Sequence, residues 1–433
     1  MNIYHELFHS KDDEELGDRY FVNYMFRFEK ALLRSQVDGG LVPKKAWEFV
    51  CENIKFEDID LDLIIKEIPL SGNAAIPFVK QLNYLVKKNG ADKSYFHLGA
   101  TSQDLIDTCM SMMLRDKIEF YISGSTRYLR DLLVELTNKY RNTVMIGRTL
   151  MQHAIPITFG LKAAKWMISV SDILQTILNE KFSLTLGGAA GSDNQYINDD
   201  VRRSVAASLG LDSTSWHENN DFAKIATHLG LLQGVLSKIA KDISLLSQTE
   251  IGELSEGNKP GKGGSSTMPH KRNPVLCTAI LANSIRVPHL VATMLSCMTQ
   301  ENERSAGAWH AQWEVMYEIV SLVSDSLVKA IDLILNLQVF PEKMKTNLDA
   351  TKGLIFSERI ALTLADQFGK DKAHELLEQA SDLVLKTNKH LKEVLTEMGI
   401  QNVDFTVCFD LQEYVVFSNY VIDQILKQNE NLI

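Results

Sequence analysis

The stretch GKGGSSTMPHKRNP, residues 261–274, stands apart from the rest of the chain in its composition. It holds three glycines, two serines, two prolines and three Lys or Arg residues in fourteen positions, whereas the 433-residue chain has only 24 glycines and 9 prolines. Glycine adopts backbone conformations that other residues avoid, and it allows close approach to a ligand. The composition therefore favours a mobile loop that faces an anion.

A phosphate-binding loop and a flexible linker are the alternatives for this segment. The phosphate-binding motif needs four residues between its first glycine and Gly-Lys, followed by Ser or Thr. Here three residues separate Gly257 from Gly261, and another glycine follows Lys262, so the motif does not match. A solvated linker fits poorly with the two prolines inside the charged segment.

Length and charge restrict the class of protein. A chain of 433 residues exceeds what one core usually holds, which predicts two or three domains. The formal charge of −10 argues against nucleic acid as a partner, because phosphate binding needs a basic field. No stretch approaches the roughly 18 uninterrupted apolar residues of a membrane span, and MNIYHELFHSKDDEEL at the N-terminus lacks the features of a secretory signal. We expect a cytoplasmic protein with no membrane partner.

The cysteines indicate neither a disulfide framework nor a zinc site. They are odd in number, widely spaced and without a CxxC pair: Cys51, Cys109, Cys277, Cys297 and Cys408. No cluster of His, Asp and Glu has the spacing of metal ligands. The sequence predicts reduced, mostly buried thiols, and neither a metal nor an organic cofactor.

The spacing of prolines maps the expected helices, because proline interrupts helix interiors. No proline occurs between Pro156 and Pro260. Within that interval, seven apolar residues follow the alternating spacing of four and three that is typical of a coiled-coil seam: Ile225, Leu229, Leu232, Leu236, Ile239, Ile243 and Leu246. The pattern predicts one helix over residues 223–254.

Other proline-poor segments predict further long helices, over residues 104–140 with Ser102 as the cap, over 157–179 and over 286–337. Alternating patterns bounded by Asn-Gly or Asp-Gly turns, the signal for strands, do not stand out. We therefore predict an all-α protein with three helical domains. These are an N-terminal domain over 1–98, a central long-helix bundle over 99–345 with the loop at 257–274, and a C-terminal domain over 346–433.

Four stretches of the chain resemble the fumarase/aspartase superfamily. They are HLGATSQDLIDT (97–108), GRTLMQHAIPITFG (147–160), GSSTMPHKRNP (264–274) and QENERSAGAWHAQWE (300–314). Members of this superfamily form or break a bond β to a carboxylate by removing the proton α to it. The resemblance implies a homotetramer in which three subunits build each active site.

The chemistry of this superfamily gives the loop a purpose. Removing a proton α to a carboxylate creates an aci-carboxylate with two negative charges, which preorganised donors and cations must stabilise. Lys271 and Asn273 are suited to that task. The resemblance implies that Ser265 is the base, with its hydroxyl kept deprotonated by backbone N–H groups and nearby cations. We predict these three residues as catalytic.

The remaining predicted site residues include donors suited to a substrate carboxylate. Some lie at the expected start of a helix, where free N–H groups and the helix dipole favour an anion. Others lie in a segment expected to lead from a loop into a helix. The predicted substrate-binding set is Thr101, Ser102, Gln103, Arg148, Thr149, Gln152, His153, Ser266, Met268 and Arg304. His97, His217 and His310 are secondary candidates, and His97 is expected to shape the loop before Thr101.

Two branches of the superfamily differ at a proton donor. Adenylosuccinate lyases carry a histidine directly after Gly-Arg-Thr and another in the N-terminal domain, whereas this chain has Leu150 and Asn73 there. Leucine cannot donate a proton. Both departures resemble the bacterial 3-carboxy-cis,cis-muconate cycloisomerases, in which a carboxylate adds across a double bond of the same molecule to give a lactone. A carboxylate is already a stable leaving group, so this reaction tolerates the loss of the acid.

Another departure affects the choice of substrate. Cycloisomerases usually read Trp-His-x-x-Arg-Asp-Arg where this chain reads WHENNDF, so Asn220 and Phe222 replace two arginines. The sequence predicts a small polycarboxylate substrate, with lactonisation of 3-carboxy-cis,cis-muconate as the main expectation. The alternatives are a carbon-nitrogen lyase, of the adenylosuccinate lyase type or for another succinyl-type substrate, and a helical scaffold without catalysis. The joint presence of Ser265, Lys271 and Asn273 argues against the scaffold.

Overall fold

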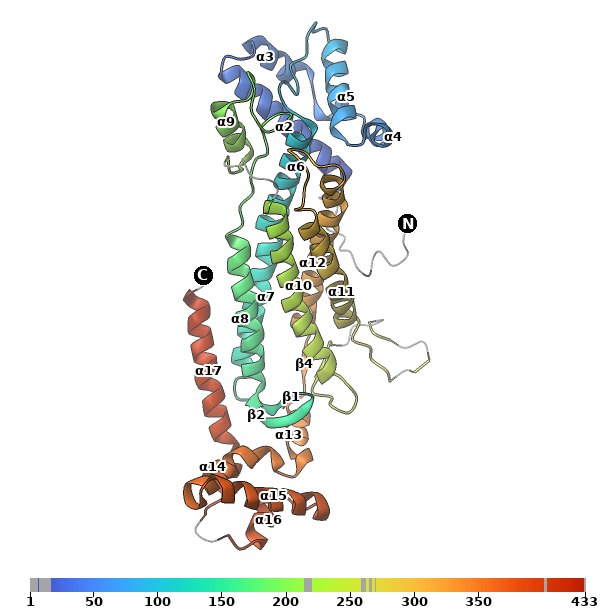
Figure 1. The fold of residues 1–433 in the computed structure, drawn as a ribbon. Coiled ribbons are helices and arrows are strands. Elements are labelled where there is room, and N and C mark those ends of the chain that lie inside the picture. Colours follow the sequence, from blue (N-terminus) through green and yellow to red (C-terminus); the bar gives the residue numbers. More distant parts are fainter. Residues whose placement is uncertain are drawn as a thin grey trace. The chain divides into compact units, whose positions relative to one another are not determined.

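A computed structural model of the chain describes residues 7, 17–213, 220–257, 262–264, 267–268, 270–400 and 403–431. Helices dominate this part of the chain, which confirms the all-α class (Figure 1). The strands form two antiparallel pairs, β1 (Val144–Thr149) with β2 (Gln152–Thr158) and β3 (Leu254–Ser255) with β4 (Gln338–Val339).

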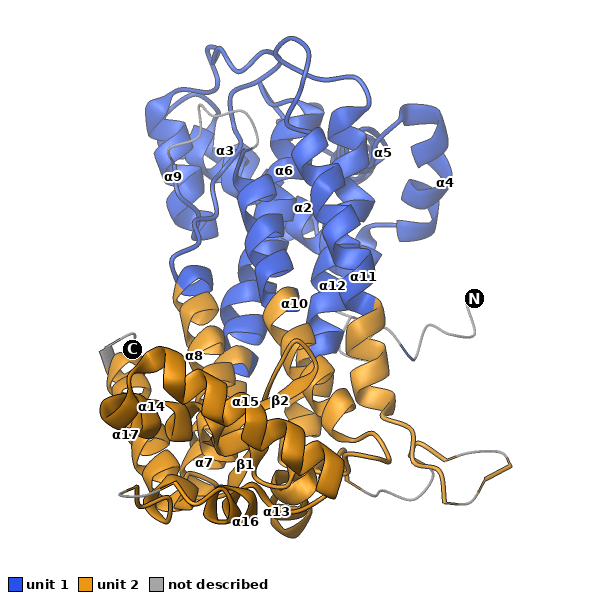
Figure 2. Cartoon of the chain, turned by 60° about the horizontal axis from the view of Figure 1, so that its bottom comes forward, with its two compact units in different colours: residues 1–125, 176–233, 283–326 blue, residues 126–175, 234–282, 327–433 orange. Residues whose placement is uncertain are grey.

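The chain divides into two compact units, and each is assembled from three separate segments (Figure 2). Unit 1 comprises residues 1–125, 176–233 and 283–326, and unit 2 comprises residues 126–175, 234–282 and 327–433. The domain boundaries predicted near residues 98 and 345 stay predictions.

Unit 1 is organised around α2, which packs against α3, α6 and α9. Phe28 and Leu32 of α2 are fully buried, and Glu29 between them is a buried carboxylate. The helices that lie entirely in this unit are α2 (Asp18–Asp38), α3 (Lys44–Asn53), α4 (Leu61–Ser71), α5 (Ala75–Lys88), α6 (Ser102–Asp116) and α9 (Asp199–Leu209). Gly72 ends α4 in the left-handed conformation, which glycine adopts without a steric penalty.

Unit 2 contains most of α7 and α8, the β1–β2 hairpin and the C-terminal helices. Its helices are α7 (Ser123–Lys139), α8 (Phe159–Leu178), α13 (Pro341–Leu348), α14 (Ser357–Phe368), α15 (Lys370–Thr387), α16 (Leu391–Glu397) and α17 (Leu411–Asn431). Ile146 of β1 joins the buried cluster of the C-terminal helices with Phe356 and Leu364, so the hairpin is held from its base.

Three long helices, α10 (Asn220–Leu246), α11 (Val275–Ser296) and α12 (Ala308–Leu335), contribute residues to both units. All seven residues of the predicted seam on α10 are buried, as the spacing predicts. The helix ends at Leu246 and not at residue 254, because the chain turns over residues 247–251, and Gly252, with a φ of 57°, does not allow a right-handed helix to continue beyond them.

Two other expected helices have different bounds. The segment 286–337 is not one helix, because residues 297–307 interrupt it where Asn302 and Gly307 adopt positive φ values of 54° and 102°. The segment 104–140 contains a π-helical stretch, Lys117–Ile122, between α6 and α7. Thr101 and not Ser102 is the N-cap of α6.

The segment around Arg148 is a β-hairpin and not the expected entry into a helix. β1 and β2 pair from Val144↔Thr158 to Thr149↔Gln152, with an irregularity between Ile146 and Arg148. Pro156 lies within β2, where a two-stranded ribbon accommodates a residue without an N–H donor.

Among the described helices, α11 is long and apolar enough to cross a membrane by length and composition, and 28% of its most apolar window is buried. Its Asn283 is fully buried and donates to the Leu322 carbonyl at 3.3 Å and to Asp325 at 3.2 Å. Ile285 and Leu295 are 69% and 48% exposed. Buried amide contacts to a neighbouring helix are typical of a packed helix, and the exposed side is an uncovered apolar surface.

Candidate active-site segments

In unit 1, buried carboxylates fix the loop that precedes α6. His97 has a φ of 59°, and both its backbone N–H and its Nδ1 contact the carboxylate of Glu29, at 2.7 and 2.6 Å. Burial by itself lowers the pKa of His97, but the Glu29 carboxylate outweighs burial and raises the pKa above its ordinary value. His97 therefore holds this loop in place, in agreement with the shape-determining role expected for it.

Asp104 anchors the start of α6 to a glycine pair. Its buried carboxylate accepts hydrogen bonds from the backbone N–H groups of Thr101 (3.1 Å), Gly187 (3.2 Å) and Gly188 (2.9 Å). Burial raises the pKa of Asp104 to about 6, despite these donors. Nη2 of Arg304 lies 3.6 Å from this carboxylate and donates to the Gly188 carbonyl at 2.8 Å. The guanidinium predicted to bind substrate thus serves this internal contact.

The side chains at the start of α6 separate into an inner and an outer set. Gln103 is buried and donates to Asp107 at 3.0 Å, and Asp107 also accepts the indole N–H of Trp309 at 2.7 Å. Ser102 instead lines a groove of about 550 Å³ together with His97 and one side of α5. Ser102 therefore borders open space, whereas Gln103 faces inward.

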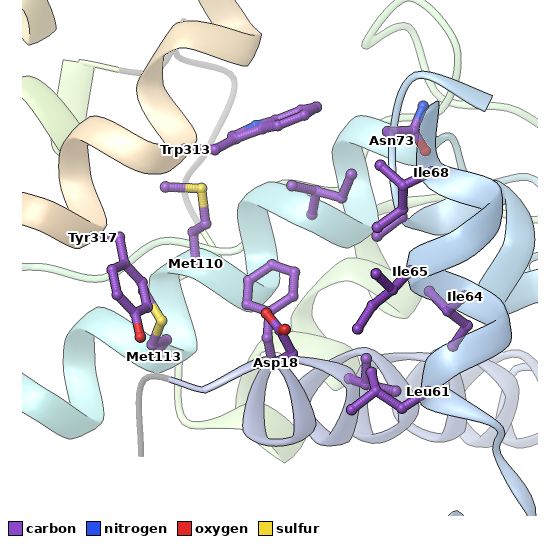
Figure 3. A pocket seen from close by; sticks show the side chains of 14 residues that line it. Asp18, Leu61, Ile64, Ile65, Ile68, Asn73, Met110, Met113, Trp313 and Tyr317 are labelled. Atoms are coloured by element: carbon purple, nitrogen blue, oxygen red, sulfur yellow. The ribbon is translucent and has the colours of Figure 1, made fainter. Parts of the chain in front are cut away.

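A second cavity of unit 1, of about 230 Å³, is lined almost entirely by apolar side chains of α2, α4, α6 and α12 (Figure 3). Asn73, which the sequence resemblance aligns with a histidine of adenylosuccinate lyases, is among the residues that line it. The side-chain oxygen of Asn73 accepts the Ala75 N–H at 3.0 Å, so it satisfies a donor at the start of α5. Among the described residues that line the cavity, Asp18 is the one carboxyl group, so the cavity offers no pair of carboxyl groups for acid–base chemistry.

In unit 2, Arg148 is bound to a carboxylate of its own chain. Its Nη1 and Nη2 donate to the two carboxylate oxygens of Glu253 at 2.9 and 2.6 Å, and the Glu253 side chain is fully buried. Asn347 donates to the same carboxylate at 2.7 Å. Both terminal nitrogens of the predicted substrate-binding arginine are therefore engaged within the chain.

The tip of the β1–β2 hairpin carries two exposed apolar residues in an unfavourable backbone conformation. Leu150 and Met151 have φ values of 46° and 66°, and they are 96% and 72% exposed. A two-residue turn with two positive φ angles is usually formed by Asn-Gly. Thr149 and Gln152 flank the tip and are also exposed, so all four side chains of the tip face outward.

His153 lies one residue beyond this tip. Burial first, and then the charge of Arg148, lower the pKa of His153 below its ordinary value. Its Nδ1 is buried and has no hydrogen-bond partner in the described part of the chain. The ring is therefore neutral near pH 7, with one nitrogen left for a partner from outside the described residues.

The base of the loop at 257–274 is closed by two sets of contacts. The buried carboxylate of Glu256 accepts the N–H groups of Leu276 (3.1 Å) and Cys277 (2.8 Å) in the first turn of α11. The Asn273 N–H donates to the Gly263 carbonyl at 2.8 Å. These contacts fix where the loop leaves and re-enters the unit.

The structure describes some of the predicted residues of the loop and not others. Lys271 and Met268 are exposed, and Asn273 is half-buried. Ser265 and Ser266 lie outside the described residues, as does the secondary candidate His217. His310 stacks edgewise on Trp309, with ring centroids 5.1 Å apart.

Sequence reasoning missed the three carboxylates that organise these segments, Glu29, Glu253 and Glu256. Each has an exposed fraction of 5% or less. Glu29 could have been found as a charged residue inside the apolar run YMFRFEKALL. No pattern around Glu253 or Glu256 distinguishes them from surface glutamates.

The four matched motifs divide between the units. HLGATSQDLIDT and QENERSAGAWHAQWE belong to unit 1, whereas GRTLMQHAIPITFG and the loop at 257–274 belong to unit 2. In the described part of the chain, no group of three or more His, Cys, Asp or Glu residues could hold a metal ion. The expectation that the protein needs no metal stays a prediction.

The sequence and the structure of the chain are similar to those of known lyases. A sequence model of the lyase family matches residues 50–288. The 3-carboxy-cis,cis-muconate cycloisomerase of Acinetobacter baylyi is 38% identical over 408 residues, which cover 92% of this chain and 90% of the relative. The crystal structure of the 3-carboxy-cis,cis-muconate lactonizing enzyme of Pseudomonas putida aligns with a TM-score of 0.90 at 34% identity and covers 99% of both chains. Adenylosuccinate lyase of Methanocaldococcus jannaschii is more distant, at 29% identity over 94% of this chain and 91% of the relative.

Proposed function

The chain belongs to the lyase family of the fumarase/aspartase superfamily and is an enzyme, and on this premise we propose that it lactonises 3-carboxy-cis,cis-muconate or a close analogue. The observation that carries this choice is Leu150. It occupies the position of the adenylosuccinate lyase proton donor, and its side chain is 96% exposed at the hairpin tip. A reaction whose leaving group is a carboxylate needs no acid at that position.

The proposed reaction is an isomerisation that balances without a co-reactant. A carboxylate oxygen of the substrate adds to one carbon of the double bond, and the electron pair of that bond moves to the neighbouring carbon and its carboxylate. The aci-carboxylate so formed takes the proton of the Ser265 hydroxyl at its α carbon to give the lactone, and the serine then regains a proton from solvent. In the opposite direction, Ser265 removes that proton and the lactone C–O bond breaks.

Lys271 and Asn273 are the proposed stabilisers of the aci-carboxylate. Lys271 is exposed and has no ion pair in the described part of the chain, so its charge is available. The backbone bond from Asn273 to Gly263 and the contacts of Glu256 at α11 hold the base of the loop. A fixed base beneath a glycine-rich segment suits closure over substrate, which excludes water and strengthens the electrostatic stabilisation.

We further propose a homotetramer with active sites shared between subunits. Two features of the single chain support this assembly. The exposed apolar side of α11, with Ile285 and Leu295, suits burial against other long helices. The outward-facing hairpin tip presents Leu150 and Met151 at a conformational cost, which is typical of functional contacts.

A carbon-nitrogen lyase remains the second candidate. The replacement of two arginines by Asn220 and Phe222 favours it, because Phe222 is buried in the core and supplies no cation for a third carboxylate. In that case the leaving amine would need a proton donor.

An ultraviolet assay with 3-carboxy-cis,cis-muconate and adenylosuccinate in parallel tests the proposal. We expect Ser265-dependent loss of the muconate chromophore, with Ser265→Ala reduced at least about a thousandfold. Turnover of adenylosuccinate alone would favour the carbon-nitrogen lyase. Equal rates for the wild type and Ser265→Ala would remove Ser265 from the mechanism.

A further inference from the structure

The groove beside Ser102, named here the α5 groove, is defined by His97, Ser102 and one side of α5, and it has a volume of about 550 Å³. The α5 residues that line it recur at intervals of one, three or four, so they project from the same side of the helix: Ala75, Ile76, Val79, Lys80, Asn83, Tyr84 and Lys87. The groove therefore lies along one side of α5, adjacent to the N-terminus of α6.

The α5 groove carries a positive charge, whereas the protein as a whole is negative. The formal charge of the chain is −10, yet no Asp or Glu is among the residues that line this groove. Lys80 is neutralised by Glu67, which it contacts through both carboxylate oxygens at 3.0 Å. Lys87 has no ion pair within the described residues, so it leaves the groove with a net positive charge.

The groove also contains hydrogen-bond donors that nothing in the described part of the chain occupies. The hydroxyl groups of Ser102 and Tyr84 and the amide of Asn83 line it without a hydrogen-bond partner there. Asn83 and Lys87 are four residues apart on α5 and thus lie side by side. An ammonium, an amide and two hydroxyl groups form a donor set suited to a carboxylate.

We infer that the α5 groove is a substrate subsite that binds a carboxylate remote from the reacting carbon, with Lys87 as its cation. This inference rests on the proposed function. The substrate named for the cycloisomerase relatives carries three carboxylates, and the aci-carboxylate accounts for one of them. Phe222 is buried, and Arg148 and Arg304 are engaged within the chain, so Lys87 supplies the missing charge for a second carboxylate.

The test compares Lys87→Ala with Lys88→Ala, which removes the same charge from the adjacent, exposed position outside the groove. We expect Lys87→Ala to raise KM for 3-carboxy-cis,cis-muconate by about tenfold to a hundredfold, the usual effect of losing a hydrogen bond to a charged group. The kcat should change little, Lys87→Arg should recover most of the affinity, and Lys88→Ala should match the wild type. An unchanged KM in Lys87→Ala would overturn the inference while leaving the proposed function intact.

Calorimetric binding of propane-1,2,3-tricarboxylate separates this inference from the proposed function. If the wild type does not turn over the muconate, the proposed function fails, but tighter binding of this tricarboxylate by the wild type and Lys88→Ala than by Lys87→Ala would still support the subsite. Equal binding by all three proteins, or binding by none, would overturn it. A second set of titrations with AMP tests for binding of a phosphate group, and an effect of Lys87→Ala on AMP binding alone would contradict a carboxylate site.

Discussion

The two terminal nitrogens of Arg148 lie 2.9 and 2.6 Å from the two carboxylate oxygens of Glu253, in a paired contact whose carboxylate is fully buried and whose guanidinium is partly buried. This pair ties the β1–β2 hairpin to the segment that leads through β3 and Glu256 into the glycine-rich loop. A planar guanidinium matches a carboxylate in this geometry, so the contact fixes orientation as well as distance. Two of the four motifs are thus mechanically linked within unit 2.

Removing one partner of this pair should destabilise the fold. Glu253→Ala leaves a guanidinium without its partner and should lower the free energy of unfolding by about 3–5 kcal/mol. Glu250→Ala, at a nearby exposed position, should change it by less than about 0.5 kcal/mol. Urea denaturation of the three proteins measures both effects. Equal stability of the two variants would show that the pair contributes no structural link.

The base of the glycine-rich loop should depend on Gly263. It has a φ of 65°, and a Cβ atom there would lie 2.4 Å from the Asn273 carbonyl oxygen, whereas a Cβ on Gly264 meets nothing within 4 Å. Gly263→Ala should therefore displace Asn273 and reduce kcat at least about tenfold, and Gly264→Ala should have a clearly smaller effect. Steady-state kinetics of both variants, with circular dichroism to confirm folding, provides the comparison. A larger loss in Gly264→Ala would contradict the assigned loop base.

Substitutions at the tip of the β1–β2 hairpin should raise the stability of the protein and lower its activity. Replacing Leu150 and Met151 by Asn and Gly gives the turn its preferred residues, and the free energy of unfolding should rise by about 1 kcal/mol. The same change removes the outward apolar side chains proposed to contact a neighbouring subunit, so turnover should fall. Leu70→Asn alters a leucine that is 90% exposed elsewhere and should leave turnover unchanged. A stabilised double variant with full activity would mean that the tip serves no functional contact.

Much of the helical framework was predictable because helix burial has a clear period. The seam from Ile225 to Leu246 is buried along its whole length, as its spacing indicates. The errors arose where single residues adopt positive φ, at Gly252, Asn302 and Gly307, because such turns depend on local backbone conformation and not on apolar period. The hairpin was missed because Leu-Met replaces the usual turn residues.

The sequence predicted the candidate site as motifs, and it could not predict the contacts of their side chains. The sequence indicated that Arg148 and Arg304 bind anions, and the structure gives each an internal partner, Glu253 for the first and the Gly188 carbonyl for the second. Those partners are 105 and 116 residues away along the chain. Pairings over such separations depend on tertiary packing, which a single sequence does not encode in any local pattern.

The buried Asp104 should make stability depend on pH in an unusual direction. Burial raises its pKa from 3.8 to about 6 in the folded protein, so the folded state holds this proton more tightly than the unfolded state. Below pH 3.8 both states are protonated, and this contribution to stability is fully present. It is lost as pH rises through about 6, and the total loss is about 3 kcal/mol.

Asp104→Asn removes this titration while keeping one acceptor for the N–H groups of Thr101, Gly187 and Gly188. The difference in unfolding free energy between the wild type and Asp104→Asn should therefore shift against the wild type by about 3 kcal/mol between about pH 3 and pH 7. Urea denaturation at intervals across that range measures this difference, and the contributions of titrating groups that do not interact with Asp104 cancel. A difference that stays constant with pH would mean that the three N–H donors and Arg304 keep the carboxylate ionised in spite of its burial.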